Sequence, residues 1–204
     1  MTDYLGFNVL EVHPNRTKDP RRSFLRSLVR LDSGLGKVTV EDRAGVSRAE
    51  LEFDWFLDGR TEIGVLQAFL LARKGRAVPF WVPSWRHDLV LNQGAAAIDT
   101  SLTIKDTGFL KYQFPQTSRR QIALILQNGT MIYRRITGAT NPGNGTEVLT
   151  LDSAVGTTIP AATTMVSFLH LVRMASDVVE VFWHHQTLAE ASMRFTEVPR
   201  EIPS

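Results

Sequence analysis

Histidine, serine and carboxylate side chains are the residues of this chain that could do acid–base, nucleophilic or metal chemistry. The five histidines are His13, His87, His170, His184 and His185. His184 and His185 are adjacent, so in a strand they point to opposite faces and cannot form a shared metal site unaided. His87 and Asp88 are also adjacent, which suits a turn better than a catalytic pair. We therefore interpret the histidines as exposed or hydrogen-bonded side chains and predict no metal site.

No nucleophile or phosphate-binding motif stands out. The sequence has no G-x-S-x-G turn of the kind that exposes a catalytic serine, and the glycines of NPGNGTE match no nucleotide-binding pattern. Asp54, Asp58 and Glu62 could supply carboxylates for glycoside cleavage, but most β proteins offer such sets by chance. The chain has no cysteine, which excludes thiolate catalysis and disulfides. The sequence predicts a protein that is not an enzyme and holds no cofactor.

Aromatic and basic side chains gather in the stretch LLARKGRAVPFWVPSW, residues 70–85. Phe80, Trp81 and Trp85 could stack on a sugar or a single-stranded nucleic acid, form a subunit interface, or fill the core. In a strand Phe80 faces one side and Trp81 the other, so one group packs inside and the other meets a partner. We interpret the stretch as core plus subunit interface.

The bulk composition is typical of a folded protein. Of 204 residues, 43% are hydrophobic and 22% charged, close to the averages for globular chains. The net charge of +2 is too small to indicate a nucleic-acid arm or a polybasic membrane patch. We see no basic-then-apolar leader and no apolar run of ~18 residues, so we expect neither leader-dependent export nor membrane insertion.

Period-two alternation of apolar and polar residues recurs along the chain and predicts half-exposed antiparallel strands. The alternating apolar sets are Leu51, Phe53 and Trp55; Val38 and Val40; and Ala191, Met193 and Phe195. Asn128 and Gly129, both able to take positive φ, predict a two-residue hairpin between 122–127 and 130–136. We expect a second hairpin that turns at Ser176 and Asp177.

One segment, residues 61–74, has the spacing of an amphipathic helix. Its apolar positions are Ile63, Leu66, Phe69 and Leu70. Asp58 or Thr61 can cap its amino end, and Gly75 suits a left-handed stop. Pro79 and Pro83 cannot donate to a sheet ladder, so the strand that follows should be irregular or lie at an edge.

These elements predict a mainly β protein: an antiparallel β-barrel or sandwich with one flanking α-helix, plus a small second β domain. We place the boundary near Arg86, because no helical pattern follows it. The first domain would cover residues 1–86, include the helix at 61–74, and be completed by a returning strand at 190–198. Residues 87–189 would form the small all-β domain.

The order of elements resembles a known family. The succession ELEFDWFLDGR, TEIGVLQAFLLARKGR and AVPFWVPSW is similar to the amino-terminal part of distal-tail and tail-hub proteins of long-tailed bacteriophages. The closing segment from VSFLHLVRM to REIP is similar to the carboxyl end of tail proteins encoded beside the tape-measure and hub genes. The resemblance is strongest in residues 50–88 and 165–200, and it rests on patterns of strand and helix rather than on an invariant signature.

The resemblance implies a tail-tube-like fold and a structural role in the virion, with assembly in the bacterial host cytoplasm. The protein would form a homo-oligomeric ring, commonly a hexamer, that joins the tail tube to the tail tip or baseplate hub. Its partners would be itself, the tube protein, the hub and the tape-measure protein, and genomic DNA would pass through the lumen without specific binding. The alternatives are a tail-tube or tail-terminator subunit, or a carbohydrate-binding β module that stacks sugars on Trp81, Trp85 and Trp183.

Two sets of residues are predicted to make contacts in such a ring. The predicted oligomer-interface residues are Trp81, Trp85, Arg73, Lys74 and Arg76. The predicted inter-ring loops are 16–22 and 139–147, with Arg16, Arg21, Arg22, Asn141 and Asn144 as contact residues. Their polar, glycine- and arginine-rich composition leads us to expect that they become ordered only on assembly.

Overall fold

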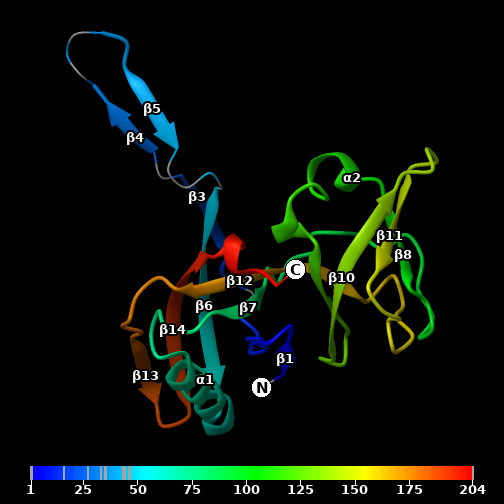
Figure 1. Cartoon of the computed structure of the whole chain (residues 1–204). Helices are drawn as coiled ribbons and strands as arrows, with labels where there is room; N and C mark the ends of the chain where they lie inside the picture. Colours follow the sequence, from blue (N-terminus) through cyan, green and yellow to red (C-terminus); the bar gives the residue numbers. More distant parts are fainter. Residues whose placement is uncertain are drawn as a thin grey trace. The chain divides into compact units, whose positions relative to one another are not determined.

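The computed structural model describes residues 2–15, 17–26, 28–32, 34, 36–42, 45 and 47–203. The chain is mainly β, with antiparallel sheets, as predicted (Figure 1). It divides into two compact units. Unit 1 comprises Met1–Glu11, Phe80–Leu171 and Ile202–Ser204, and unit 2 comprises Val12–Pro79 and Val172–Glu201. This division differs from the predicted one, because the amino-terminal residues belong to unit 1 and residues 172–189 to unit 2.

Unit 1 surrounds its own apolar core. Its elements are β1 (Asp3–Tyr4), β2 (Phe7–Asn8), β7 (Phe80–Pro83), β8 (Ser101–Lys105), α2 (Phe109–Tyr112), a 3-10 turn (Thr117–Arg119), β9 (Gln121–Ile125), β10 (Met131–Thr140), β11 (Thr146–Leu151) and the first part of β12 (Met165–Met174). The single turn α2 departs from the prediction of an all-β second domain.

The sheet of unit 1 has the order β12-β9-β10-β11-β8. A further stretch of backbone bridges both ends of this series, with Leu89 opposite Val166 of β12 and Leu91 opposite Ile104 of β8. The stretch therefore brings β12 and β8 together around a common interior. Side chains from all these strands, including Leu102, Leu124 and Ile136, fill that interior.

The Glu147 carboxylate is fully buried in unit 1, where it organises the turn α2. It accepts backbone N–H groups of Thr107 (3.3 Å), Phe109 (2.9 Å) and Leu110 (2.9 Å). Two of these donors, Phe109 and Leu110, are first-turn N–H groups that the short helix leaves without an internal partner, so a side chain from β11 satisfies them. Glu147 has a structural role here.

Trp81 lies in the core of unit 1, with 0% of its surface exposed, so the prediction that it is a surface anchor is wrong. The amino-terminal segment covers it. Trp81 Nε1 donates to the carbonyl oxygen of Tyr4 at 2.8 Å, and the Leu10 N–H donates to the Trp81 carbonyl oxygen at 2.9 Å. All four residues of β7 are buried, and β7 pairs with β12.

The predicted hairpin between β9 and β10 is confirmed, but its turn is different. Gly129 has a φ of 84°, whereas Asn128 is not among the residues with positive φ. The Gly129 N–H donates to Leu126 O at 3.0 Å, and the Leu126 N–H donates to Thr130 O at 2.9 Å. The turn is therefore a right-handed one followed by a left-handed glycine, a common three-residue hairpin connection.

Unit 2 packs one long helix against an open sheet. Its elements are β3 (Arg21–Leu25), β4 (Leu28–Leu31), β5 (Thr39–Asp42), β6 (Arg48–Asp58), α1 (Arg60–Arg73), the end of β12, β13 (Val181–His185), β14 (Leu188–Glu197) and a 3-10 turn (Pro199–Glu201). The predicted return of the last strand is confirmed, because β14 pairs with β6 along nine residues. The strand order β3-β6-β14-β13 has two ends, so this sheet is not closed into a barrel.

The buried face of this sheet carries the alternating residues that the sequence predicted. Phe53 and Trp55 of β6 and Phe195 of β14 form an aromatic cluster with ring centroids 5.8–6.1 Å apart. Trp55 Nε1 donates to the carbonyl oxygen of Val12 at 3.1 Å, which satisfies its one polar group. The pattern of β6 and β14 is therefore a half-buried one, as expected.

Helix α1 occupies the predicted position, and Ile63, Leu66 and Phe69 are its buried apolar residues. Its amino end differs from the prediction, because Gly59 is the N-cap and makes no side-chain cap. Glu62 instead reaches back and accepts the Asp58 N–H at 3.2 Å. Within the part of the chain that the structure describes, no helix has the length and apolarity needed to cross a bilayer.

Strands β4 and β5 form a separate two-stranded ribbon. The expectation that Val38 and Val40 mark a half-buried strand is wrong, since Val38 lies before β5 and Val40 is 60% exposed. Leu28 and Leu31 of β4 are also more than half exposed. Alternation alone therefore predicted the strand but not a core to cover it.

We predict that Trp81→Ala destabilises the protein by about 3–5 kcal/mol, because it removes a buried indole and leaves a cavity. Trp183→Ala, at a side chain that is 53% exposed, should change the stability of the monomer by no more than about 0.5 kcal/mol. Urea unfolding followed by circular dichroism, at a concentration below any self-association, measures both. A Trp81→Ala variant that stays stably folded but self-associates more weakly would contradict the burial of Trp81 and support its role at a subunit interface.

Candidate interaction surface at the carboxyl end of helix α1

Strands β12 and β13 lie on the same edge of β14, so the predicted hairpin at Ser176 and Asp177 is wrong. Both strands are antiparallel to β14, with Met174 opposite Phe195 and Val181 opposite Ala191. Between these two pairs the edge has six residues, 175–180, facing only three, 192–194, on β14. We call residues 175–180 the strap. The excess length makes it a large bulge, in which Ala175 still donates its N–H to the Arg194 carbonyl oxygen at 2.9 Å.

The strap is attached to the loop that follows α1 through Asp177. The Asp177 carboxylate accepts the Arg76 backbone N–H at 2.9 Å and the Arg76 guanidinium Nε and Nη2 at 3.1 and 2.9 Å. One carboxylate therefore holds both the backbone and the side chain of Arg76. Such fork-to-fork pairing fixes direction as well as distance.

Gly75 makes this approach possible. Its φ is 62°, and a Cβ built on it would lie 2.5 Å from Asp177 Oδ1 and 3.3 Å from Asp177 Cα. Lys74 just before it is also left-handed, with φ 51°, and ends the helix. Two left-handed residues in succession turn the chain back toward the strap, and the second has no room for a side chain.

Arg173 holds the same loop from the end of β12. Its guanidinium donates to the carbonyl oxygens of Arg76 (3.0 Å) and Ala77, and it pairs with Glu201 at 2.7 Å. Two side chains thus hold the loop after α1: Asp177 binds the N–H and guanidinium of Arg76, and Arg173 binds the carbonyl oxygens of Arg76 and Ala77. Sequence reasoning assigned Asp177 to a hairpin turn and did not identify Arg173, because neither residue belongs to a local motif.

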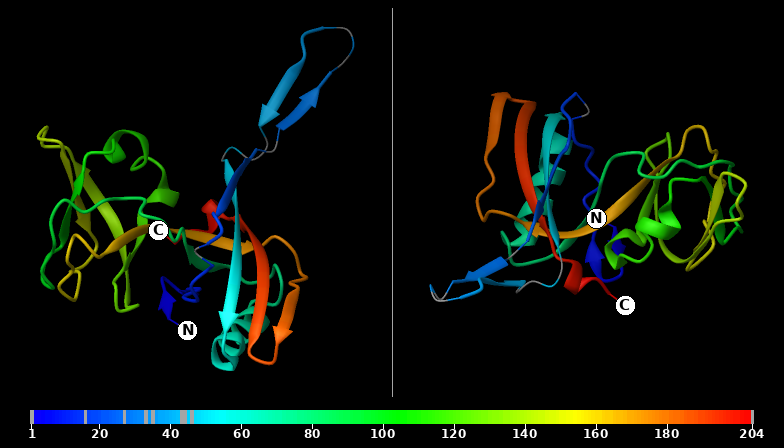
Figure 2. Two further views of the ribbon diagram at one scale, coloured as in Figure 1. Left: turned by 180° about the vertical axis from the view of Figure 1, so that it is seen from behind. Right: turned by 90° about the horizontal axis from the view of Figure 1, so that it is seen from above.

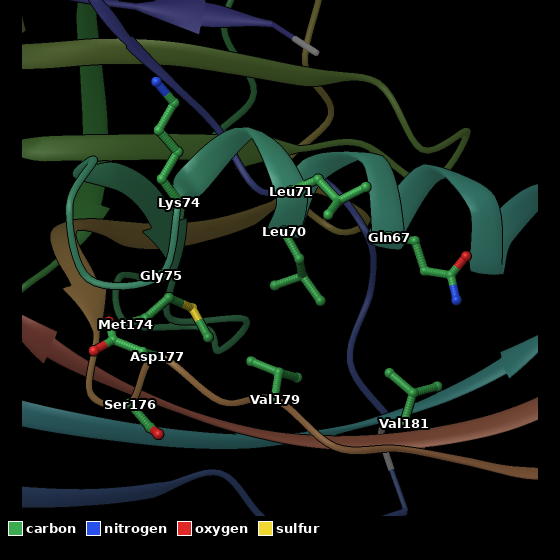
Figure 3. A pocket seen from close by; sticks show the side chains of 10 residues that line it. All are labelled: Gln67, Leu70, Leu71, Lys74, Gly75, Met174, Ser176, Asp177, Val179 and Val181. Carbon is green, nitrogen blue, oxygen red and sulfur yellow. The ribbon is translucent and has the colours of Figure 1, made fainter.

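A cavity of about 430 Å³ lies between the second half of α1 and the strap (Figure 3). It is lined by Gln67, Leu70, Leu71, Lys74, Gly75, Met174, Ser176, Asp177, Val179 and Val181. Leu70 points from the helix toward Val179, whereas Lys74 points away from the cavity (Figure 3). A second hollow, of about 320 Å³, also borders the strap and is lined by Ser192, Met193 and Arg194 of β14. The strap is therefore open along much of its length.

The ion pair at the strap shifts both of its pKa values. Hydrogen bonds and charge from Arg76 hold the pKa of Asp177 below its ordinary value of 3.8, and Asp177 raises the pKa of Arg76. The two side chains are 57% and 62% exposed, so the pair is screened by water and contributes little to global stability. Its effect is to position the strap.

The predicted interface residues have different environments. Lys74 and Arg76 are exposed beside the strap, so their role in an interface stays a prediction. Arg73 is only 5% exposed, with its guanidinium 4.8 Å from the centre of the Phe69 ring, and burial lowers its pKa. Arg73 is therefore not accessible to a partner, and its place among the predicted interface residues is wrong. Trp85 is half-buried in unit 1, with a φ of 57°.

The predicted loop residues lie in different kinds of structure. Arg16 lies outside the described residues, and Arg21 and Arg22 are exposed residues of strand β3 rather than of a loop. Asn141 and Asn144 lie in the connection between β10 and β11, where Asn141 accepts the Gly143 N–H at 2.8 Å and Asn144 accepts the Thr146 N–H at 3.2 Å. These local hydrogen bonds shape the turns of the connection, and the expectation that it becomes ordered only on assembly stays a prediction.

The side chains considered for chemistry are dispersed. His170 is buried beside Arg119, with Nδ1 3.3 Å from Arg119 Nη1, and His184 lies 3.5 Å from Glu190 at the surface. Among the residues described by the structure, no three histidine, aspartate or glutamate side chains are grouped as metal ligands. The buried ring of Trp81 is also closed to a sugar, so the proposed stacking platform loses one of its three members.

No protein-family model matches this sequence, and a comparison with curated proteins finds no relative.

We predict that Gly75→Ala destabilises unit 2 more than a matched change at another left-handed glycine. Gly143 is the control, because its φ is 80° and no atom lies within 4 Å of a Cβ placed there. Gly143→Ala should cost about 1–2 kcal/mol for backbone strain alone. Gly75→Ala should cost a further ~1–3 kcal/mol, because the methyl group meets Asp177. Chemical unfolding of the two variants measures the difference, and equal losses would argue against a close contact.

We also predict that acid loosens the strap. Because the folded-state pKa of Asp177 is lowered, its stabilising contribution is present above pH 3.8 and is lost as the pH falls through the folded value. Hydrogen exchange at residues 175–180, corrected for the intrinsic rate, should therefore speed up below about pH 3.8. Asp177→Asn should exchange quickly at every pH. Protection that is the same at pH 3 and pH 6 in the unmodified protein would contradict this role.

Proposed function

We propose that the protein is a structural subunit of a bacteriophage tail that assembles head to tail into a homo-oligomeric ring. The ring would lie at the distal end of the tail and join the tail tube to the tip or baseplate hub. The resemblance of residues 50–88 and 165–200 to distal-tail and tail-hub proteins supports this assignment. The succession of strand β6, helix α1 and strand β7 agrees with the element order on which that resemblance rests.

The observation that carries the proposal is the pair of free edges on the sheet of unit 2. Among the described residues, β3 pairs only with β6, and β13 pairs only with β14. Exposed edges of this kind favour pairing with another chain, and native monomers usually block them. Here they instead carry Phe24, 70% exposed, and Trp183, 53% exposed. Two different edges on one subunit favour a head-to-tail interface, which closes into a ring when the rotation permits.

The ribbon of β4 and β5 adds further apolar surface. Leu28, Leu31 and Val40 are 53–60% exposed, which is unusual for large apolar side chains in a monomer. A neighbouring subunit or the next ring would cover them. This ribbon takes the place of the predicted loop 16–22 as the segment of unit 2 that we assign to contacts outside a single subunit.

The proposed partners are a second copy of this chain, the tail-tube protein, the hub and the tape-measure protein. Genomic DNA would pass through the lumen without specific contacts, and the small net charge of +2 agrees with a surface that does not retain it. No residue is assigned a catalytic role.

Electron microscopy and light scattering of the purified protein test the proposal. We expect single or double rings whose mass is a small integer multiple of the 22.9 kDa chain. Long hollow tubes would instead identify a tube subunit of the same machine. A monomer at all concentrations up to the millimolar range would overturn the proposal.

A further inference from the structure

Strand direction restricts how two copies can join through the free edges of unit 2. Each neighbouring pair in the order β3-β6-β14-β13 is antiparallel. With four strands alternating, β3 and β13 run in opposite directions (Figure 2). If successive copies are related by rotation about an axis close to the strand direction, β13 of one copy is antiparallel to β3 of the next. The alternation of the sheet then continues through the junction.

The faces of the two edge strands restrict the register. Phe24 pairs with Ala49 of β6, which belongs to the buried face of the sheet. Trp183 pairs with Ala189 of β14, which belongs to the same face. Residues directly opposite each other in an antiparallel pair share a face. Phe24 can therefore lie opposite Val181 or Trp183, but not opposite Phe182.

Exposed apolar side chains distinguish these two registers. With Phe24 opposite Trp183, Leu25 comes opposite Phe182 on the other face. This arrangement pairs Phe24 (70% exposed in the single chain) with Trp183 (53%), and Leu25 (43%) with Phe182 (59%). With Phe24 opposite Val181, Phe182 meets Ser23 and Leu25 has no apolar partner.

We infer that the subunits join by antiparallel pairing of β13 with β3 of a second copy, in the register that places Phe24 opposite Trp183 and Leu25 opposite Phe182. This inference rests on the proposed ring assembly and names the surfaces that close it. The two strands have five residues each, and in this register residues 22–25 of β3 lie opposite residues 182–185 of β13.

Engineered disulfides test the register directly, because the natural chain has no cysteine. Directly opposite residues of an antiparallel pair have Cα atoms about 4.5–5.5 Å apart, within reach of a disulfide. Under mild oxidation the double variant Phe24→Cys/Trp183→Cys should give a non-reducing ladder that ends at the copy number of the ring. Leu25→Cys/Phe182→Cys should give the same ladder. A mixture of Phe24→Cys and Trp183→Cys single variants should stop at dimers.

Two controls use the same strands. Ser23→Cys/Trp183→Cys places the thiols on opposite faces and should give no ladder, and Phe24→Cys/Val181→Cys reports the rival register. Circular dichroism confirms that each variant is folded. In addition, Trp183→Ala should weaken self-association about tenfold without unfolding the monomer.

The outcomes separate this inference from the proposed function. A ladder from the predicted pairs, with none from the controls, supports the register. Rings in the microscope without a ladder from either predicted pair, or a ladder only from Phe24→Cys/Val181→Cys, would overturn the register while leaving the ring in place. A natural chain that forms no oligomer overturns both.

Discussion

The sheet of unit 2 depends on the backbone pairing of strand β14 along both of its edges. This strand pairs along one edge with β6, and along the other edge with the end of β12 and with β13. Its buried side chains, from Ala189 to Phe195, form one apolar face together with those of β6. Because this strand comes from the end of the chain, the sheet is complete only when residues some 140 positions apart have paired.

The strap follows from that arrangement. Two strands that share one edge of β14 leave a surplus of residues between them, and the surplus has to leave the sheet. Because the strap leaves the ladder, Asp177 lies beside the left-handed end of α1, where Gly75 leaves room for its carboxylate. Helix, strap and sheet are thereby held in one arrangement, although the ion pair between them is exposed. The same central position of β14 leaves β3 and β13 as the outer strands, with aromatic side chains and unpaired edges.

Local patterns predicted the elements that local interactions define. The apolar spacing of Ile63, Leu66 and Phe69 located α1 within one residue of its bounds, and the alternation in β6 and β14 gave the correct buried face. The glycine of the β9–β10 turn was also identified correctly. In contrast, the alternation of β5 indicated a buried face where none exists, because burial depends on what else is nearby. Of the candidate surface, Lys74 and Arg76 were identified, while Asp177 was assigned to a turn and Arg173 was missed.

The sequence by itself determined the mainly β class and the single long helix, because apolar periodicity and turn residues act over a few positions. It could not determine which aromatic side chains stay outside. Trp81 is buried because the segment around Tyr4 and Leu10 folds over it, and Trp183 stays exposed because β13 is the last strand of its sheet. Both outcomes depend on contacts between residues far apart in the chain. For that reason only the tertiary structure decided where the strap, the cavity and the free edges lie.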